Sequence, residues 1–284
     1  MRKLLFLLIG IGLLVSCSGQ QPEVAVRCAT FNIRYDNPGD SLNAWSYRKD
    51  SVCRFIKEAE LEVIGMQEVL FRQTEDLKAA LPAFDMVGVG RDDGHTLGEY
   101  SPIFYRKDKF ELLDSQTFWL SQYPDSVGFI GWDGACTRIA TWAKLKDVVT
   151  GKIFMFVNTH FDHVGTQARR EAALLIIDRI KQIAGKYPAI LTGDLNVTDS
   201  SEAYLTLTTN EFVLKDAHKI AEVREGVEYT FHGFGRVPVA ERSKIDFVLV
   251  TPSIQVSKSF IPGIVEHAVT YLSDHNPQVV DLKF

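Results

Sequence analysis

The sequence predicts an α/β sandwich, in which two packed, mostly antiparallel sheets carry helices on their outer faces. The first observation is a series of ten short apolar or alternating runs that have the length and composition of strands. The second is that helical periodicity is confined to a few segments, two of which lie between strand-like runs. Because strands outnumber helices, two sheets packed face to face with helices outside would bury all of these apolar faces.

The strand-like runs extend over nearly the whole chain: Val24 to Asn32, Val63 to Gln67, Asp85 to Val89, Pro102 to Arg106, Thr117 to Leu120, Arg138 to Leu145, Ile153 to Asn158, Ile190 to Thr192, Ile245 to Val250 and Val279 to Leu282. No heptad array, repeat of solenoid period or obvious linker interrupts them. A chain of 284 residues with 46% hydrophobic composition is long enough for one large core. We therefore expect residues 23–284 to form a single domain.

Three segments have the periodicity of amphipathic helices. The clearest is Gln167 to Ala184, and a second extends from Tyr47 to Ala59 with its apolar residues at the spacing of one buried face. The third, Gln73 to Ala80, is shorter. Each presents one apolar stripe, which predicts packing on the outer face of a sheet.

The N-terminus has the pattern of a bacterial secretory signal. Arg2 and Lys3 precede a 12-residue apolar run that ends at Val15, which is well below the roughly 20 residues that a membrane-spanning helix needs. The sequence Leu-Val-Ser-Cys that ends at Cys17 resembles a lipoprotein signal, which implies cleavage before Cys17 and its lipidation. An ordinary signal peptide with an incidental cysteine is the alternative. Residues 1–17 are thus expected to direct secretion, with a membrane-anchored product in the outer membrane or periplasm.

The charge of the chain argues against strong nonspecific binding of nucleic acid. The formal net charge is -5, and removal of Arg2 and Lys3 would leave 29 basic against 36 acidic residues. Proteins that hold a long phosphate backbone usually present a basic stripe, and the sequence has no run of Lys or Arg. A small or lipid-linked partner is therefore favoured over nucleic acid, and we expect a monomer.

Polar side chains accompany the apolar runs at their ends. The set comprises Asn32, Gln67, Glu68, Asn158, His160, Asp194, Asn196, Asp246, Asp274, His275 and Asn276. One such residue beside a strand is usually a turn former. A carboxylate or amide beside a buried strand is costly to desolvate unless it is paired or bound to a cation. The listed residues fall into six groups along the chain, each at the end or the beginning of an apolar run. Six such groups in one chain therefore predict one shared polar site.

The residue types restrict the chemistry of that site. The candidate ligands offer oxygen, and the chain has no thiolate cluster, His-Glu-x-x-His motif or paired histidine spacing. Hard cations such as Mg²⁺, or Mn²⁺ in its place, prefer such ligands. Since no nucleophile elbow or Walker loop occurs either, the simplest mechanism is direct attack by water with a base and a metal ion.

The order of these motifs resembles the endonuclease/exonuclease/phosphatase superfamily, of which DNase I is the familiar member. The motifs are Asn32, Gln67-Glu68, Asn158-Thr159-His160, Gly193-Asp194-Leu195-Asn196, Ile245-Asp246 and Ser273-Asp274-His275. Residues 32–37, 98–105 and 118–121 are further similar to a bacterial secreted lipoprotein branch. The resemblance implies a DNase I-like four-layer α/β sandwich.

The resemblance also implies a role for each motif residue. Glu68 would be the principal metal ligand, Asn32 would lie beside it, and Asp274 would support metal-bound water. His275 would be the general base that activates water, and Asp246 would orient it. Three residues would act around the phosphate: Asp194 and Asn196 would position the nucleophile and the phosphate, and His160 would donate a hydrogen bond to a nonbridging oxygen. A core histidine is the alternative for His160.

Three further residues are candidates for substrate contact. Arg138 could bind phosphate, Glu99 could contact substrate or a second metal ion, and His232 could line the substrate pocket. The alternatives are a surface ion pair for Arg138, a loop carboxylate for Glu99 and a solvent-exposed loop histidine for His232.

These expectations favour a divalent-metal-dependent phosphoester hydrolase, either a phosphodiesterase or a phosphatase, that acts on a small or lipid-linked phosphoester. An extracellular nuclease of the same fold is the first alternative. An alternative of another class is a noncatalytic surface module that binds a phosphorylated ligand, which would need a broken site. Because a suitable residue fills every expected catalytic position, the hydrolase is preferred.

Overall fold

The computed structural model describes residues 23–209, 212, 214–263 and 271–284. The predicted signal peptide and the predicted lipidation site Cys17 lie outside this range. Within it, no helix combines the length and the apolar character that crossing a bilayer would require.

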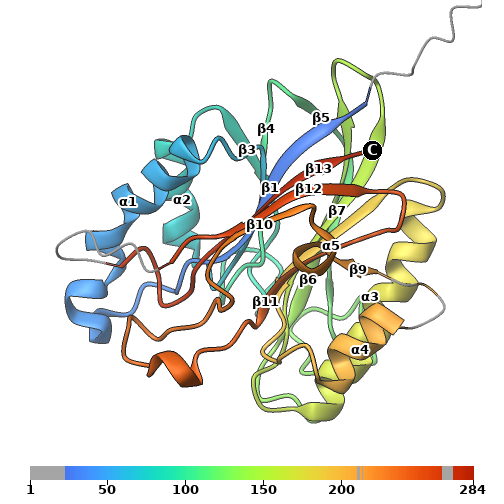
Figure 1. Cartoon of the computed structure of the whole chain (residues 1–284). Coiled ribbons are helices and arrows are strands. Elements are labelled where there is room, and N and C mark those ends of the chain that lie inside the picture. The colour runs from blue at the N-terminus through green and yellow to red at the C-terminus, as the bar shows by residue number, and fades with distance from the viewer. Residues whose placement is uncertain (1–22, 210–211, 213, 264–270) are drawn as a thin grey trace, which may run out of the picture.

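Two stacked sheets form the centre of the molecule (Figure 1). The first has the strand order β10-β12-β13-β1-β2-β4-β3. Its strands are β1 (Ala25–Asn32), β2 (Val63–Gln67), β3 (Phe84–Val87), β4 (Ile103–Arg106), β10 (Val223–Gly226), β12 (Gln255–Ile261) and β13 (Gln278–Lys283). The second has the order β5-β6-β7-β8-β11-β9. Its strands are β5 (Phe110–Trp119), β6 (Ile139–Asp147), β7 (Ile153–His160), β8 (Ala189–Asp194), β9 (Lys215–Asp216) and β11 (Asp246–Val250).

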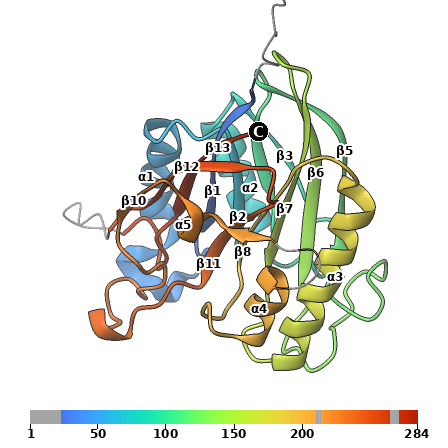
Figure 2. The same cartoon turned by 45° about the vertical axis from the view of Figure 1, so that its right-hand side comes forward.

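Helices cover the two outer faces, which completes the predicted four-layer sandwich (Figure 2). Helices α1 (Trp45–Glu58) and α2 (Phe71–Ala80) pack on the first sheet, and α3 (Thr166–Ala184) packs with α4 (Glu202–Thr209) on the second. A short α5 (Ala217–Ile220) and the 3-10 turns Pro38–Asn43 and Val239–Glu241 complete the described elements. Most strand pairs are antiparallel, as predicted, while β1 with β2, β7 with β8, and β10 with β12 are parallel.

The strands that the sequence did not predict lack regular alternation. All four residues of β10 are exposed, and β9 has only two residues. In β12 the register against β13 shifts between Val256 and Lys258, which breaks the period of two. The first part of β5 contains a similar shift between Leu112 and Asp114. A bulge moves the following side chains to the other face, so a pattern search misses such strands.

Along the central strands, the side chains that face the other sheet are apolar within the strand and polar at one end. In β1, Val26 and Cys28 face the second sheet, whereas Ala29 and Phe31 face the helices. Because successive side chains alternate between faces, Asn32 lies on the inner face. The same reasoning places His160, Asp194 and Asp246 there, since Phe156, Ile190 and Val248 belong to the core between the sheets.

Strand register brings these inner-face residues to one edge of the sandwich. Asn32 pairs with Gln67 across parallel β1 and β2, and His160 pairs with Asp194 across parallel β7 and β8. Strand β11 is antiparallel to β8, so that its first residue, Asp246, lies opposite the last residue of β8. Strand β13 likewise begins where β1 ends, which delivers the preceding 273–276 segment to the same edge. The polar site therefore lies where four strands end and two begin.

A buried polar network joins the two sheets directly beneath this edge. The Gln67 side chain donates to Asn158 Oδ1 at 2.6 Å, and the Asn158 amide donates to the carbonyl oxygens of Met66 and Pro102. Gln67 and Asn158 are fully buried. The motif positions 67 and 158 therefore connect the sheets below the site and do not line it.

Gly65 makes the close approach of the sheets possible, and its replacement provides a test. A Cβ atom there would lie 2.1 Å from Thr192 Oγ1 and 2.5 Å from Asn158 Oδ1. We expect Gly65→Ala to lower the free energy of unfolding by about 1 to 3 kcal/mol through overpacking, measured by urea denaturation. Gly263→Ala is a control without that clash, since its backbone does not need a positive φ and its Cβ position meets only Val227 Cγ1 at 3.4 Å. Equal stability of both variants would contradict this description of the interface.

Candidate active site

Asp194 at the end of β8 lies at the centre of the site. One carboxylate oxygen, Oδ1, accepts from the backbone nitrogen of Asn196 at 2.9 Å. The other, Oδ2, accepts from Asn32 Nδ2 at 3.0 Å and lies 3.5 Å from His160 Nε2 and 3.8 Å from His275 Nε2. The structure thus brings four predicted site residues, Asn32, His160, Asn196 and His275, around the buried carboxylate of a fifth, Asp194.

His275 is held between two carboxylates. Its Nδ1 lies 2.8 Å from Asp246 Oδ2, and its Nε2 faces Asp194. Burial alone would lower the pKa of His275, but Asp246, aided by Asp194 and Asp274, raises it to about 10. Burial and the nearby Asp246 raise the pKa of Asp194 to about 7. Without another cation, the site therefore retains protons that offset its negative charge.

Glu68, Asn32 and Asp274 occupy the first-sheet side of the site. Asn32 Nδ2 bridges the carboxylates of Glu68 and Asp194 at 3.0 Å each. Glu68 directly follows β2 in the left-handed region, with φ of 61°. Asp274 is buried, and burial raises its pKa despite the nearby His275. Three carboxylates thus converge near one asparagine.

This donor set fits a divalent metal ion. Ligand atoms of Asp194, Asp246 and His275 lie within 4.8 Å of one another, and Glu68 joins this group through the Asn32 amide. The buried Asp246 Oδ1 has no hydrogen-bond partner. Oxygen-rich sets with unpaired carboxylate oxygens suit hard cations. Either the Glu68 side or the Asp194 side of Asn32 could hold the ion.

Comparisons with known proteins agree with this geometry. The profile of the Endonuclease/Exonuclease/phosphatase family matches residues 29–275. The chain belongs to this family. Among solved structures, an endonuclease/exonuclease/phosphatase from Bacteroides vulgatus is 64% identical, with a TM-score of 0.89 over 91% of this chain and 98% of that one. A mannosyl-6-phosphatase from Bacteroides thetaiotaomicron is 36% identical, with a TM-score of 0.85 over 91% of this chain and all of its own.

Curated relatives are more distant and longer. Nocturnin from Drosophila melanogaster is 26% identical over 202 residues, which cover 66% of this chain. The chain spans only 28 to 30% of the length of the curated relatives that it matches. The family to which the chain belongs comprises phosphatases, nucleases and other phosphoesterases that depend on divalent metal ions.

His160 lies in the site with its two ring nitrogens in different surroundings. The Asn196 amide donates to the Phe161 carbonyl oxygen at 2.9 Å, which fixes its orientation and places its nitrogen 3.0 Å from His160 Nε2. Nε2 is therefore the acceptor, and the ring proton lies on Nδ1. Burial, with the charges of Arg138 and Arg91, holds the pKa of His160 well below its usual value. In this arrangement neutral His160 positions Asn196 through Nε2, and its Nδ1 is a buried donor without a hydrogen-bond partner. Donation to a phosphate oxygen therefore stays a prediction and would come from Nδ1.

Glu99 and Arg138 form a charged group beside His160. Arg91 donates to Glu99 Oε2 at 2.8 Å, and the same oxygen lies 3.8 Å from His160 Nδ1 and 4.0 Å from Arg138 Nη1. Arg138 is only 7% exposed, and its Nε and Nη1 have no hydrogen-bond partner. A surface ion pair is thus excluded for Arg138. Both residues lie next to the site, as predicted for substrate contact.

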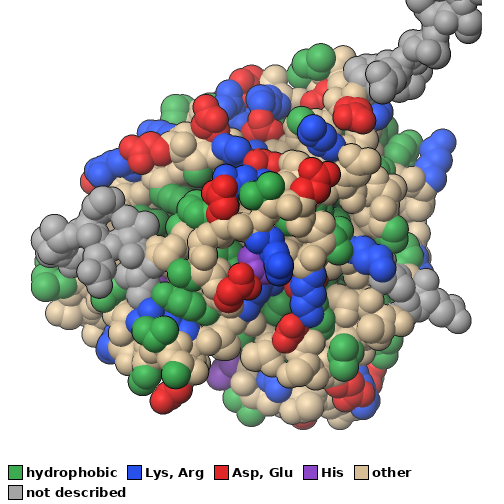
Figure 3. Space-filling view, in the orientation of Figure 1, with side chains coloured by type: hydrophobic (Ala, Val, Ile, Leu, Met, Phe, Trp, Pro, Cys, Tyr) green, Lys and Arg blue, Asp and Glu red, His purple; other side chains and the backbone are tan. Residues whose placement is uncertain are grey.

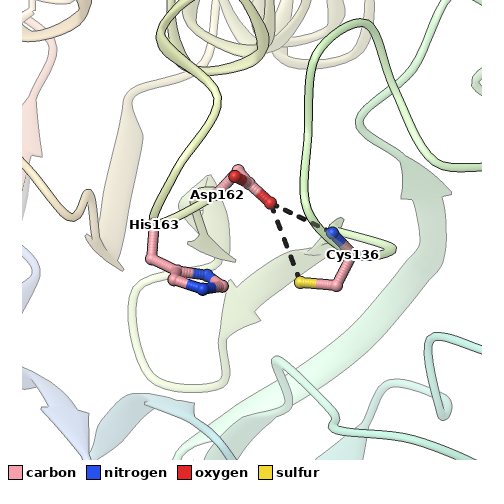
Figure 4. Close-up of side chains that lie close together, drawn as sticks. All are labelled: Cys136, Asp162 and His163. Atoms are coloured by element: carbon pink, nitrogen blue, oxygen red, sulfur yellow. Dashed lines mark hydrogen bonds between the residues drawn. The ribbon is translucent and has the colours of Figure 1, made fainter.

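Figure 4 shows a second group of possible metal ligands, Cys136, Asp162 and His163. Arg138 lies beside this group, with its Nε 3.8 Å from Asp162 Oδ2. The Asp162 carboxylate is already used: Oδ1 accepts from the nitrogens of Val164 and Gly165, and Oδ2 accepts from that of Ala135. Arg138 Nη2 lies 3.1 Å from His163 Nδ1. A fixed guanidinium disfavours another cation there. Cys136, Asp162 and His163 therefore connect two loops and orient Arg138.

His232 is buried, which excludes the alternative of a solvent-exposed loop histidine, while a place in the lining of the substrate pocket stays a prediction. It is 2% exposed, and its Nδ1 accepts from the Gly235 nitrogen at 3.1 Å. Its own backbone nitrogen donates to the Asp274 carbonyl oxygen at 3.0 Å. The histidine therefore shapes the loop that supports Asp274 and His275.

Burial and the nearby charge of His275 lower the pKa of His232 to about 4, which predicts an acid-labile fold. An unfolded histidine titrates near 6.5, so the unfolded state binds the extra proton first as the pH falls. The contribution is present above about pH 6.5 and is lost between 6.5 and 4, amounting to at most about 3 kcal/mol. His232→Asn should flatten the pH dependence of urea unfolding in this window, whereas His95→Asn, at an exposed position, should not. An unchanged slope in His232→Asn would contradict this assignment.

Arg48 and Gln73 hold the loop after β1, and no sequence pattern singles them out. Arg48 is fully buried and donates to the carbonyl oxygens of Ile33 and Leu272 at 2.8 and 2.7 Å. Gln73 donates to the Arg34 carbonyl oxygen and accepts from the Asp36 nitrogen, both at 3.0 Å. Both lie in helices with ordinary amphipathic patterns. Only the path of the loop reveals their role.

Proposed function

We propose that this enzyme hydrolyses a small phosphomonoester, with a sugar phosphate as the leading substrate class, by direct attack of water. The observation that carries the proposal is the alignment of Asp246, His275 and Asp194, with 2.8 Å between the first pair and 3.8 Å between the second. It is supported by the 36% identity to a mannosyl-6-phosphatase over 91% of the chain. Because His275 Nε2 and Asp194 Oδ2 lie 3.8 Å apart, one water molecule in a polar gap to the side of both atoms can hydrogen-bond to both and be deprotonated.

Each residue of the chain has a defined task in this proposal. Asp246 fixes the His275 ring with Nε2 facing the gap, and His275 accepts the proton of the attacking water. Asp194 orients that water, and Asn196, held by His160 Nε2 at 3.0 Å, lies beside the phosphate. Arg138 supplies positive charge from the second-sheet side.

A bound Mg²⁺, for which Mn²⁺ could substitute, would neutralise phosphate charge as a Lewis acid. Glu68 and Asn32, with Asp274 next to them, are the proposed residues that hold it. Because two carboxylates hold His275 in its protonated form in the metal-free site, a nearby cation would also favour the neutral, basic form of the ring.

We further propose that Cys17 anchors the enzyme outside the cytoplasm, with the site directed away from the membrane. Strand β1 begins at Ala25 and ends at Asn32 in the site. Its length of roughly 23 Å therefore separates the site from the end of the strand that follows Cys17. The seven residues between Cys17 and Ala25 span at most about 25 Å. The short connection favours a soluble substrate over one embedded in the anchoring membrane.

The extracellular nuclease remains the second candidate because the family includes nucleases. The negative net charge of the chain weighs against it. Acidic and basic side chains are interspersed on the face in Figure 3, without a continuous basic stripe. The noncatalytic binding module is less favoured, since the base, its carboxylate partner and the acidic cluster are all in place.

A substrate panel separates these candidates. The purified protein with Mg²⁺ or Mn²⁺ would be tested on mannose 6-phosphate, p-nitrophenyl phosphate, bis-p-nitrophenyl phosphate, plasmid DNA, RNA and a phospholipid in vesicles. We expect kcat/KM for the sugar phosphate to exceed that for the diester by at least about tenfold, which is 1.4 kcal/mol in transition-state stabilisation. Preferential cleavage of DNA or RNA would establish the nuclease instead. Metal binding without turnover of any substrate would favour the binding module.

A further inference from the structure

Arg34 is a charged residue beside Glu68 and Asp274 at the edge of the site. The proposed mechanism gives it no role. It follows β1 by two residues and adopts φ of 57°, in the left-handed region. A residue with a side chain is disfavoured there and persists only where its surroundings hold it. Two predicted site residues, Glu68 and Asn196, share this conformation with φ of 61° and 52°. Strained backbone thus accompanies the site residues, and Arg34 is among them.

The surroundings fix the Arg34 backbone from both sides. Its nitrogen donates to Asn32 Oδ1 at 3.0 Å. Its carbonyl oxygen accepts from Gln73 Nε2 at 3.0 Å and from Arg48 Nη2 at 3.3 Å. Gln73 and Arg48 are fully buried. Two buried polar side chains are therefore used to hold one half-buried loop residue in a strained conformation.

The guanidinium group is also fixed, but it is not fully used. Asp40 accepts from Nε at 3.0 Å and from Nη2 at 3.3 Å, and the group stacks on the Tyr35 ring at 4.4 Å. Glu68 Oε2 lies 3.8 Å from Nη1, and Asp274 Oδ2 lies 3.9 Å from Nε. These two distances are too long for hydrogen bonds. Among the described residues Nη1 donates no hydrogen bond, and the side chain is 23% exposed.

We propose that Arg34 is a substrate-binding residue that donates from Nη1 to a phosphoryl oxygen and favours a dianionic phosphomonoester over a monoanionic diester. This inference rests on the proposed phosphomonoesterase function. Glu68, Asp194 and Asp274 make the site acidic, which repels a dianion more than a monoanion. A clamped guanidinium beside Glu68 offsets this repulsion and matches the geometry of phosphate oxygens. It acts from the first-sheet side, opposite to Arg138.

A purely structural role would have different consequences. If Arg34 only balanced the charges of Glu68 and Asp274, its loss would lower stability or metal affinity and would affect all substrates equally. Substrate contact instead predicts a selective loss of phosphate affinity and of monoester preference. The structural role and the substrate-contact role therefore predict different affinities for phosphate and different ratios of monoester to diester hydrolysis.

The test compares the purified protein with Arg34→Met, Arg34→Lys and the exposed-helix control Arg54→Met. Binding of inorganic phosphate to the Mn²⁺-saturated proteins is measured by calorimetry, together with Mn²⁺ affinity and Tm. The ratio of kcat/KM for p-nitrophenyl phosphate to that for bis-p-nitrophenyl phosphate is measured in parallel. Arg34→Met should raise the Kd for phosphate about 10- to 100-fold, as expected for a lost hydrogen bond to a charged group, with Mn²⁺ affinity unchanged. Its Tm should fall because Asp40 loses its hydrogen-bond donor, while the protein stays folded at the assay temperature. Arg34→Lys should lose less, and Arg54→Met should lose nothing.

Unchanged phosphate affinity, or an equal loss on both esters, would overturn the role of Arg34. A loss of Mn²⁺ affinity, or unfolding at the assay temperature, that accounts for the weaker phosphate binding would overturn it as well. If the unaltered protein prefers the diester, the proposed function fails. The calorimetric comparison then still decides whether Arg34 binds a phosphoryl group, since it requires no turnover.

Discussion

Replacing His275 by Ala is expected to lower kcat for phosphoester hydrolysis by about 10²- to 10⁴-fold, the usual contribution of a general base. The reason is that His275 Nε2 is directed at the gap beside Asp194 while Nδ1 is fixed by Asp246. Steady-state kinetics at saturating Mg²⁺ measure the effect. His95→Ala is the matched control, because His95 is an exposed loop histidine and should retain full activity.

The His275 result has a clear contrary outcome. If His275→Ala retains activity within a few fold, another group removes the proton from water and the proposed mechanism is wrong. The partner variant Asp246→Asn should also lose activity, because an amide can hold the ring in the wrong tautomer. Full activity of Asp246→Asn would show that His275 acts as the base without support from Asp246.

Asp194→Asn is expected to lower the activity by about 10³-fold or more, an effect comparable to that of His275→Ala. The same change is expected to preserve or raise the stability of the fold. The carboxylate orients water and lies within reach of Asn32, His160 and His275. Its pKa is raised by burial to about 7, above its value near 3.9 in the unfolded chain. Its charge therefore opposes folding, increasingly as the pH rises from 4 through 7. At pH 8 the neutral amide should preserve Tm or raise it by a few degrees.

Kinetics and calorimetric unfolding at pH 8 test the Asp194 prediction. Asp199→Asn is the control, since Asp199 is an exposed carboxylate paired with Lys219. A variant that loses both activity and Tm would indicate that Asp194 mainly supports the fold. Retained activity would show that its carboxylate takes no part in the reaction.

The fold and much of the site could be predicted because strand alternation and strand ends are local properties. The polar residues that end or begin the apolar runs, such as Asn32, Asp194 and Asp246, lie on inner faces at one edge. Gln67 and Asn158 carry the same signal, yet they lie one step deeper and join the sheets. The pattern therefore marks the polar edge without distinguishing lining residues from supporting ones.

The missed residues depend on contacts between segments that are distant in sequence. Arg48 lies in α1 and reaches the Leu272 carbonyl oxygen, and no feature near Arg48 indicates that partner. The significance of Arg34 arises from its closeness to Glu68 and Asp274, far along the chain. The burial of His232 could not be predicted for a related reason, because a loop sequence does not reveal that the loop is buried against Asp274.

The most direct test of the central claim, that this edge is a metal-dependent phosphoester hydrolase site, is a metal titration of activity with Glu68→Gln beside the unaltered protein. The chelator-treated proteins would be titrated with Mg²⁺ and Mn²⁺ while hydrolysis of p-nitrophenyl phosphate is followed, with the exposed Glu75→Gln as control. We predict no activity without metal, saturable activation of the unaltered protein and the control, and a midpoint at least about tenfold higher in Glu68→Gln. Full activity in chelator, or the same midpoint in Glu68→Gln, would contradict the assignment of this edge as the metal-dependent site.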